Sequence, residues 1–141
     1  GRGQNNTRPV KHVYTDGSCT NNGKINSQCG SGVWYGHDHP ENLALCIGGE
    51  ANTNNIGELA AVIATLTQQD GLTPLLIHTD SEHVKKGLTE RLKTWEDQGW
   101  IGVANAEYFQ AAAYRMRIRS ATVTFNWVKG HAGIEGNEGA D

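Results

Sequence analysis

Long hydrophobic runs, prolines and methionines are scarce in this sequence of 141 residues. The longest uninterrupted apolar stretch covers residues 59–64, far too few to span a bilayer, and the polar residues 1–7 lack the apolar core of a signal peptide. With 37% hydrophobic residues, 18 glycines and 3 prolines, the composition is typical of one globular domain with many tight turns. We therefore expect a single domain without a membrane-spanning segment.

Cysteine is equally scarce, and its spacing excludes two kinds of site. Cys19, Cys29 and Cys46 contain no CxxC pair and leave one thiol over, which argues against a disulfide framework and against a structural zinc site. We expect free thiols that pack as small hydrophobic side chains. This favours an intracellular, reducing compartment such as the cytoplasm, the nucleus or the mitochondrion.

Positive charge is in deficit, because 12 Lys and Arg face 15 Asp and Glu and the formal net charge is -3. Nucleic-acid-binding domains are usually basic, so the total charge does not predict one. Basic side chains nevertheless gather at residues 85–93 and at residues 115–119. Taken alone, each cluster is most simply the solvated face of a helix.

The hydrophobic pattern predicts strands and helices after a flexible leader at residues 1–9. Strands are expected at residues 10–15, 29–35, 43–47, 75–77 and 122–128, and the first three are predicted to form an antiparallel meander. Helical spacing begins at Asn54, with Leu59, Val62 and Leu66 on one face. Further helices are expected at residues 81–88, 90–97 and 105–117.

Three acidic residues occupy related places in this pattern. Asp16 and Asp80 each follow a predicted strand, and parallel neighbouring strands would place both side chains at one edge of the sheet. Glu58 lies in the first turns of the predicted helix, next to its apolar stripe. The Asp-Gly pair at residues 16–17 has a simpler alternative interpretation as turn chemistry.

Clustered carboxylates repel one another unless cations neutralise them, and oxygen ligands without thiolates suit Mg²⁺ or Mn²⁺. Two such ions would activate a water molecule and stabilise the leaving oxygen of a phosphodiester. Asp141, the last residue, is a possible fourth carboxylate. Residue type and topology thus favour a phosphoryl-transfer site.

Four separated stretches add a specific pattern. They are YTDGS at residues 14–18, TNNIGELAA at 53–61, TDS at 79–81 and GHAGIEGNEGAD at 130–141. In order, spacing and content they resemble the type 1 ribonuclease H domains, from about residue 10 onward. The resemblance implies an α/β, ribonuclease H-like fold over residues 10–141, with a five-stranded mixed sheet of three antiparallel strands and then two parallel ones, flanked by helices.

The resemblance also implies an activity: cleavage within the RNA strand of RNA/DNA hybrids with two Mg²⁺ ions, or Mn²⁺ as substitute, leaving 5'-phosphate and 3'-hydroxyl ends. We expect the isolated domain to be a monomer. By position, the metal-binding carboxylates of the family correspond to Asp16, Glu58, Asp80 and Asp141. The mobile-loop histidine corresponds to His131, which flanking glycines would allow to move and which can shuttle a proton near neutral pH.

Substrate contacts can be assigned only through the resemblance. Asn22, Asn54 and Asn55 match positions that touch the minor groove or the RNA 2'-hydroxyls, the groups that distinguish RNA from DNA. Thr53 and Asn105 match positions that hold a phosphate of the DNA strand, and Trp95, with Trp100, matches an aromatic segment along the DNA channel. Without the resemblance, the three asparagines are turn and cap residues, and Trp100 would at least equally well pack on the core.

Two departures from the family pattern predict weaker hybrid binding. Ala51 stands where the phosphate pocket often has an arginine, which removes a bidentate donor. Glu96 and Asp97 stand where a basic protrusion often carries lysines or arginines, which would lower both affinity and its salt dependence.

Other enzymes with this type of fold match less well. Integrases and transposases have glutamate as their last catalytic acid, whereas Glu58 precedes Asp80, and many 3'-5' exonucleases have a glutamate where this chain has Ser18. A non-catalytic module that binds or tethers hybrids is the alternative of another class. A helix has barely begun where the sequence stops, so we expect a truncated C-terminal helix, in a cellular enzyme or a retroelement domain.

Overall fold

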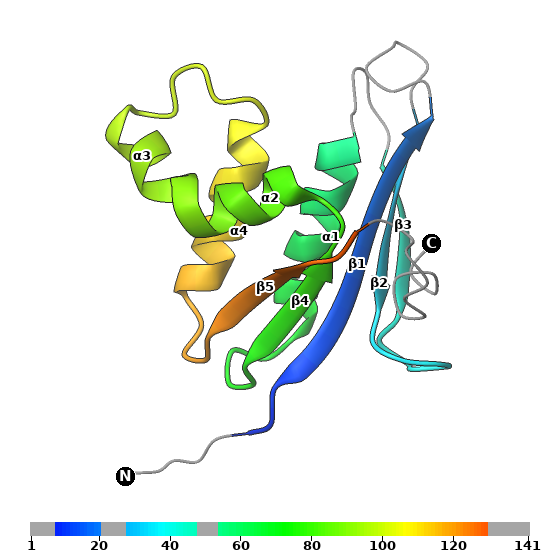
Figure 1. Ribbon diagram of the computed structural model, residues 1–141. Coiled ribbons are helices and arrows are strands. Elements are labelled where there is room, and N and C mark those ends of the chain that lie inside the picture. Colours follow the sequence, from blue (N-terminus) through cyan, green and yellow to red (C-terminus); the bar gives the residue numbers. More distant parts are fainter. Residues whose placement is uncertain (1–7, 21–27, 48–53, 130–141) are drawn as a thin grey trace, which may run out of the picture.

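The computed structural model describes residues 8–20, 28–47 and 54–129. Five strands form one mixed sheet in the order β3-β2-β1-β4-β5, and helices pack against it (Figure 1). The strands are β1 (Lys11–Thr20), β2 (Gln28–Trp34), β3 (Leu43–Ile47), β4 (Leu75–Thr79) and β5 (Val123–Trp127). The helices are α1 (Asn54–Gln68), α2 (Glu82–Lys86), the π-helical turn η1 (Gly87–Arg91), α3 (Leu92–Asp97) and α4 (Ala106–Arg117).

The strand directions confirm the predicted topology. β1, β2 and β3 pair antiparallel, whereas β4 pairs parallel to β1 and β5 pairs parallel to β4. The sheet is therefore mixed, with an antiparallel meander on one side of β1 and a parallel pair on the other. β1 is the strand at which the two halves meet.

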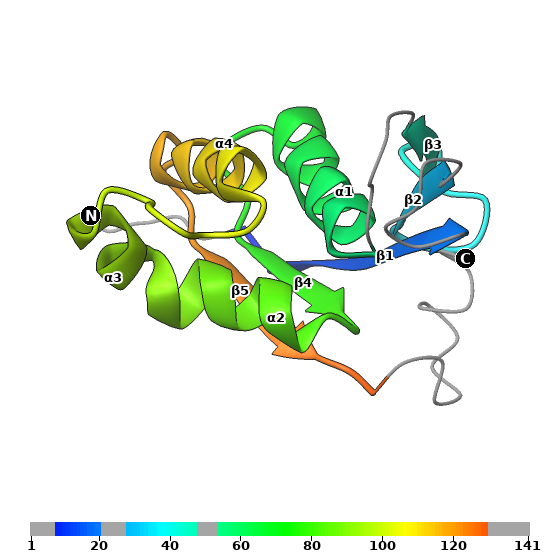
Figure 2. The ribbon, with the colours of Figure 1, turned by 90° about the horizontal axis from the view of Figure 1, so that it is seen from above.

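One face of the sheet carries the hydrophobic core. α1 and α4 lie side by side over this face (Figure 2), and α1 packs on both β1 and β2. The buried stripe of α1 includes Leu59, Val62 and Leu66, as its helical spacing predicts. These side chains meet Ile77 of β4 and Phe109 of α4, which are both fully buried.

The first strand is longer than its sequence predicts. β1 does not end at Thr15 but continues to Thr20, because its antiparallel pairing with β2 extends to the pair Thr20 and Gln28. Its parallel pairing with β4 stops earlier, at Thr15 and Thr79. The prediction that Asp16 follows the strand is therefore wrong: Asp16 lies inside β1, at the point where β4 has ended.

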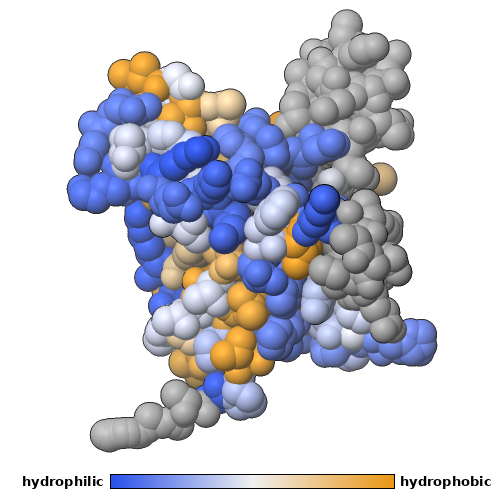
Figure 3. All heavy atoms as spheres, viewed as in Figure 1, coloured by the Kyte–Doolittle hydropathy of each residue, from blue (hydrophilic) through white to orange (hydrophobic). Residues whose placement is uncertain are grey.

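The segment from Glu82 to Asp97 also differs from its prediction as two separate helices. It is helical throughout, with the π-helical turn η1 joining α2 to α3. Gly87 lies where the segment crosses α4, and a Cβ atom there would lie 2.4 Å from Cε1 of Phe109. Glycine thus allows this close approach. Seen from the side of Figure 1, the surface over α2 and α3 is mostly hydrophilic (Figure 3), as expected of exposed helix faces.

The structure also bears on the expectations about membrane-spanning segments and about free thiols. Within the described residues, no helix is both long and apolar enough to cross a membrane. Cys46 is a free thiol, but it is exposed and so does not pack as a buried hydrophobic side chain. The alternation of a strand explains the difference, because Cys46 and its neighbour Leu45 point to opposite faces of the sheet.

Candidate metal-binding and catalytic site

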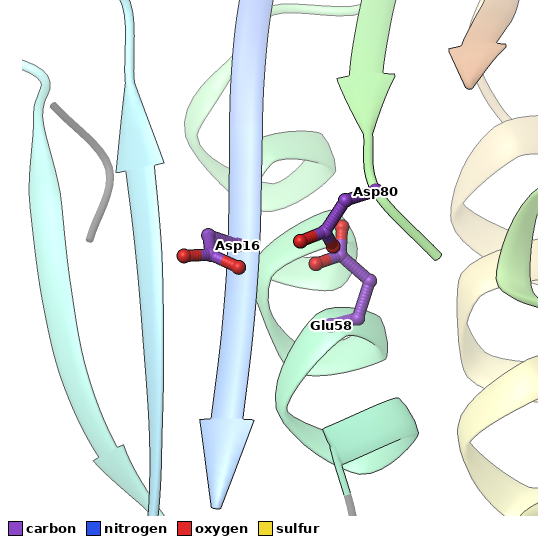
Figure 4. Close-up of side chains that lie close together, drawn as sticks. All are labelled: Asp16, Glu58 and Asp80. Atoms are coloured by element: carbon purple, nitrogen blue, oxygen red, sulfur yellow. The ribbon is translucent and has the colours of Figure 1, made fainter. Parts of the chain in front are cut away.

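The three acids that the sequence singles out lie together in the structure. One carboxylate oxygen from each of Asp16, Glu58 and Asp80 lies within 4.8 Å of the other two. Figure 4 shows Glu58 reaching from α1 towards Asp80, with Asp16 of β1 beside them. Asp16 and Glu58 are only 5% and 1% exposed, so the cluster is largely withdrawn from water.

Strand register brings the two aspartates to the same edge. Thr15 and Thr79 are partners in the parallel pairing of β1 with β4. Asp16 is the next residue of β1, and Asp80 directly follows the end of β4. After Asp80 the chain turns away at once, because Ser81 caps α2 by accepting a hydrogen bond from the Val84 amide at 3.1 Å. The repeated Thr-Asp dipeptide therefore becomes a pair of aligned carboxylates.

Glu58 comes close to the aspartates because the first turn of α1 lies directly on the sheet. Gly17 of β1 and Ser31 of β2 are register partners beneath this turn. A Cβ atom at Gly17 would lie 2.2 Å from the backbone nitrogen of Glu58, and the Ser31 hydroxyl donates to the Gly57 carbonyl at 2.5 Å. Only glycine allows so close a contact, and it sets the height of Glu58 above β1.

Two threonine hydroxyls hold the Glu58 carboxylate. Oγ1 of Thr15 and Oγ1 of Thr79 both donate to Oε1 of Glu58, at 2.5 Å and 2.6 Å. Among the described residues, Oε2 has no hydrogen-bond partner although it is buried. Burial raises the pKa of Glu58 to about 7, the two threonine hydrogen bonds oppose this rise, and the nearby charge of Asp80 adds to it.

This arrangement fits a divalent cation. An unpartnered buried carboxylate oxygen is costly in the absence of a positive charge, and two further carboxylates nearby increase the repulsion. The donor set consists of oxygen atoms, which suits hard cations such as Mg²⁺ or Mn²⁺. Asp16, Glu58 and Asp80 are therefore the described residues that could hold such an ion.

A cavity of about 350 Å³ opens beside the acids. It is lined by Gly17, Asn54, Asn55, Glu58, Asp80, Ser81, Glu82 and His83. Oδ1 of Asn55 accepts a hydrogen bond from the Ser81 hydroxyl at 3.1 Å, which joins the start of α1 to the start of α2. Of the predicted substrate-binding residues, Asn54 and Asn55 thus border the same cavity as two of the acids.

Trp95 and Asn105 lie elsewhere in the described structure and do not line this cavity. The Trp95 ring packs on Phe109, with ring centroids 4.8 Å apart, and on Trp100 at 5.9 Å, so both Trp residues contribute to the core. Asn105 precedes α4 with a left-handed φ of 59°, and its side chain makes no capping hydrogen bond. Their predicted contacts with the DNA strand remain predictions.

Several predicted positions lie outside the described residues. They are Asn22, Ala51, Thr53, His131 and Asp141. Their assignments to substrate binding, to proton transfer and to the fourth metal ligand therefore remain predictions.

The acidic residues of α3 are paired with bases. Glu96 forms a two-pronged ion pair with Arg117 at the end of α4, and Asp97 pairs with Lys93 at 3.3 Å. The Arg117 guanidinium lowers the pKa of Glu96, mainly by hydrogen bonding. The positive charges of Arg117 and Lys93 therefore offset locally the negative charges of Glu96 and Asp97.

The residues that orient Glu58 are not identifiable from the sequence alone. In the sequence, Thr15 and Thr79 are marked only by their positions directly before Asp16 and Asp80. Gly17 can equally be interpreted as a turn residue. Ser31 gave no signal, because its acceptor is a backbone carbonyl of another element. The repeated Thr-Asp dipeptide at the ends of two apolar segments was the one available signal.

Comparisons with known proteins agree with this fold. The sequence model of the family described as RNase H matches residues 8–141. The chain is 41% identical to "Ribonuclease H" of Saccharopolyspora erythraea, over 92% of this chain and 84% of that protein. It is 37% identical to "Ribonuclease H" of Schizosaccharomyces pombe and 31% identical to "Ribonuclease H1" of Homo sapiens, in each case over 92% of this chain. It spans about half the length of these two relatives, 49% and 46%.

Solved structures give the same result. LC9-RNase H1, a type 1 RNase H with the type 2 active-site motif, superposes with a TM-score of 0.69 at 26% identity, over 96% of this chain and 71% of the other. The solution structure of the PFV RNase H domain shares the fold, with a TM-score of 0.67 at 22% identity, over 92% of this chain and 88% of that domain. From the match over residues 8–141 and the relatives above 30% identity, the chain belongs to the ribonuclease H family of enzymes.

Proposed function

We propose that this protein hydrolyses the RNA strand of RNA/DNA hybrids at internal positions, leaving 5'-phosphate and 3'-hydroxyl ends. The observation that carries the proposal is the cluster of Asp16, Glu58 and Asp80, with a buried Glu58 oxygen that lacks a partner among the described residues. Membership of the ribonuclease H family supports both the reaction and the substrate. The likeness in fold to RNase H domains agrees with it.

Asp16, Glu58 and Asp80, together with Asp141, would hold two Mg²⁺ ions, with Mn²⁺ as a substitute. Bound there, the ions would supply an activated water and stabilise charge on the leaving oxygen of the phosphodiester. Asp16, Glu58 and Asp80 fix this position, because each of these three side chains comes from a regular element or from the residue directly after one. Burial of Asp16 and Glu58 keeps bulk water from weakening the electrostatic attraction.

Other residues of the chain would position the substrate. Asn54 and Asn55 border the cavity beside the acids, where their amides can hydrogen-bond RNA 2'-hydroxyls. Asn22, Thr53, Trp95 and Asn105 would contact the hybrid further along, and His131 would move a proton or assist product release. We also propose that the domain acts as a monomer. We further propose a reducing, intracellular compartment, and the exposed free thiol of Cys46 supports this choice of compartment.

A cleavage assay with strand-specific labels tests the proposal. We expect the RNA strand of a hybrid to be cut when Mg²⁺ is present and to survive with chelator, while the DNA strand stays intact. Asp80→Asn should lose cleavage, because it removes one charge from the cluster with little change in shape. Asp70→Asn is the matched control, since Asp70 is an exposed acid that pairs with Arg8 and does not line the cavity beside the acids. Hybrid binding without cleavage under every metal condition would refute the proposal.

A further inference from the structure

Thr15 and Thr79 share one acceptor, the carboxylate of Glu58. They are register partners on neighbouring parallel strands, and both donate to the same carboxylate oxygen, Oε1. A carboxylate oxygen offers about two lone-pair positions, so two hydroxyl donors occupy those of Oε1. The second oxygen, Oε2, is buried and has no partner among the described residues.

We infer that Thr15 and Thr79 are positioning residues that hold Oε1 of Glu58 and thereby leave Oε2 as the oxygen presented to a divalent cation. The inference rests on the proposed metal-dependent function and specifies how one ligand is oriented. Glu58 would then coordinate through a single oxygen. The hydroxyls of Thr15 and Thr79, each of which directly precedes one of the two aspartates, restrain the rotation of the carboxylate.

Burial makes the two hydroxyls effective. Thr15 and Thr79 are 0% exposed and Glu58 is 1% exposed, so water does not compete for Oε1. The other acceptor near the Thr15 hydroxyl, the carbonyl of His78, lies at 3.4 Å, which is long for a hydrogen bond of this type. The Thr15 hydroxyl is therefore directed mainly at Glu58.

A backbone hydrogen bond orients the second hydroxyl. The amide of Ser81 donates to Oγ1 of Thr79 at 3.0 Å, which uses a lone pair of that oxygen and leaves its proton for Glu58. Ser81 directly follows Asp80 and caps α2. These two hydrogen bonds, from Ser81 to Thr79 and from Thr79 to Glu58, couple the turn that places Asp80 to the orientation of the Glu58 carboxylate.

A narrower explanation is that the hydroxyls only satisfy a buried carboxylate. Metal affinity separates the two explanations, because a structural role alone would lower stability and leave ion binding unchanged in the folded protein. Thr15→Val removes the hydroxyl with little change in volume, and Thr15→Ser retains it. Thr65→Val is the matched control, since the fully buried Thr65 hydroxyl donates to the Ala61 carbonyl two turns further along α1.

The experiment measures binding of Mg²⁺ and Mn²⁺ to the whole chain by titration calorimetry, and cleavage of a hybrid over a range of metal concentrations. Thr15→Val and Thr79→Val should each weaken ion binding about tenfold or more, with kcat recovering at high metal concentration and KM for the hybrid unchanged. Thr15→Ser should bind within about twofold of wild type, and Thr65→Val should bind as wild type does. Equal affinity of Thr15→Val and wild type, or failure of Thr15→Ser to restore affinity, would overturn the inference.

A measurement on the wild-type protein avoids dependence on variants that do not fold. The infrared difference spectrum on addition of Mg²⁺, compared with that of Glu58→Gln, should show the carboxylate stretching pattern of coordination through one oxygen. A two-oxygen pattern for Glu58 would overturn the inference even if the enzyme is active. If wild type neither binds Mg²⁺ nor cuts the hybrid, the proposed function itself fails, which is a different outcome.

Discussion

Glu58→Gln should stabilise the metal-free protein at alkaline pH while abolishing its response to Mg²⁺. Gln has nearly the same shape, its Oε1 can still accept from both threonines, and its amide nitrogen replaces the unpartnered oxygen. The variant therefore removes the buried charge and keeps the packing. Stability and metal binding should change in opposite directions.

The magnitude follows from the pKa of Glu58. Burial raises this pKa from 4.5 to about 7, so between these values the folded chain binds more protons than the unfolded chain. The unfolding free energy consequently falls as pH rises through this window. At about 1.4 kcal/mol per pKa unit, wild type should lose about 3 kcal/mol above the window, and Glu58→Gln should not.

Urea unfolding in the presence of chelator measures the effect, at about pH 5 and about pH 8. The free-energy difference between Glu58→Gln and wild type should grow in favour of the variant by about 2 to 3 kcal/mol from the lower to the higher pH. Saturating Mg²⁺ should then restore about 2.7 kcal/mol to wild type at a hundredfold excess over Kd, and much less to the variant. Glu90→Gln, which removes an exposed carboxylate, is the control and should follow wild type. An unchanged difference at the two pH values would refute the reasoning.

Two further predictions concern Gly17 and Ala51. Gly17→Ala should cost about 1 to 3 kcal/mol of stability and weaken Mg²⁺ binding, because the added methyl group overlaps the backbone at Glu58; urea unfolding and calorimetry measure both. Gly36→Ala, where nothing lies within 4 Å of the added atom, should do neither, and equal effects of the two substitutions would contradict the positioning role of Gly17. Ala51→Arg should tighten hybrid binding at low salt by about 1 kcal/mol, since it returns a bidentate phosphate donor, and an unchanged Kd would count against a phosphate pocket at this position.

Much of the fold could be predicted from periodicity. Strand and helix spacing depend on which side chains face the core, so the elements and the meander were visible in the sequence. The approach of the two aspartates was also predictable from the alignment of neighbouring parallel strands, although Asp16 lies inside β1 and not after it. Glu58 was predictable to within its helix, since its position bordered the apolar stripe.

Contacts between distant segments could not be predicted. The extension of β1 beyond Thr15 depends on pairing with β2. An Asp-Gly pair looks the same in the sequence whether its glycine lies in a turn or, like Gly17, beneath a helix. The ion pair of Glu96 likewise depends on Arg117, which is 21 residues away in the sequence and on another helix. Local sequence indicates where a charge is, whereas its partner is decided by tertiary packing.

The direct seating of α1 on β1 has a thermodynamic consequence for ligand binding. Because α1 lies directly on β1 at Glu58, and Asp16 is fixed by strand pairing, ion binding should order very little of the chain around these two ligands. The conformational entropy of the site is therefore lost during folding and not during binding. Calorimetry should accordingly find binding driven by water released from the ion and the carboxylates, with only a small change in heat capacity.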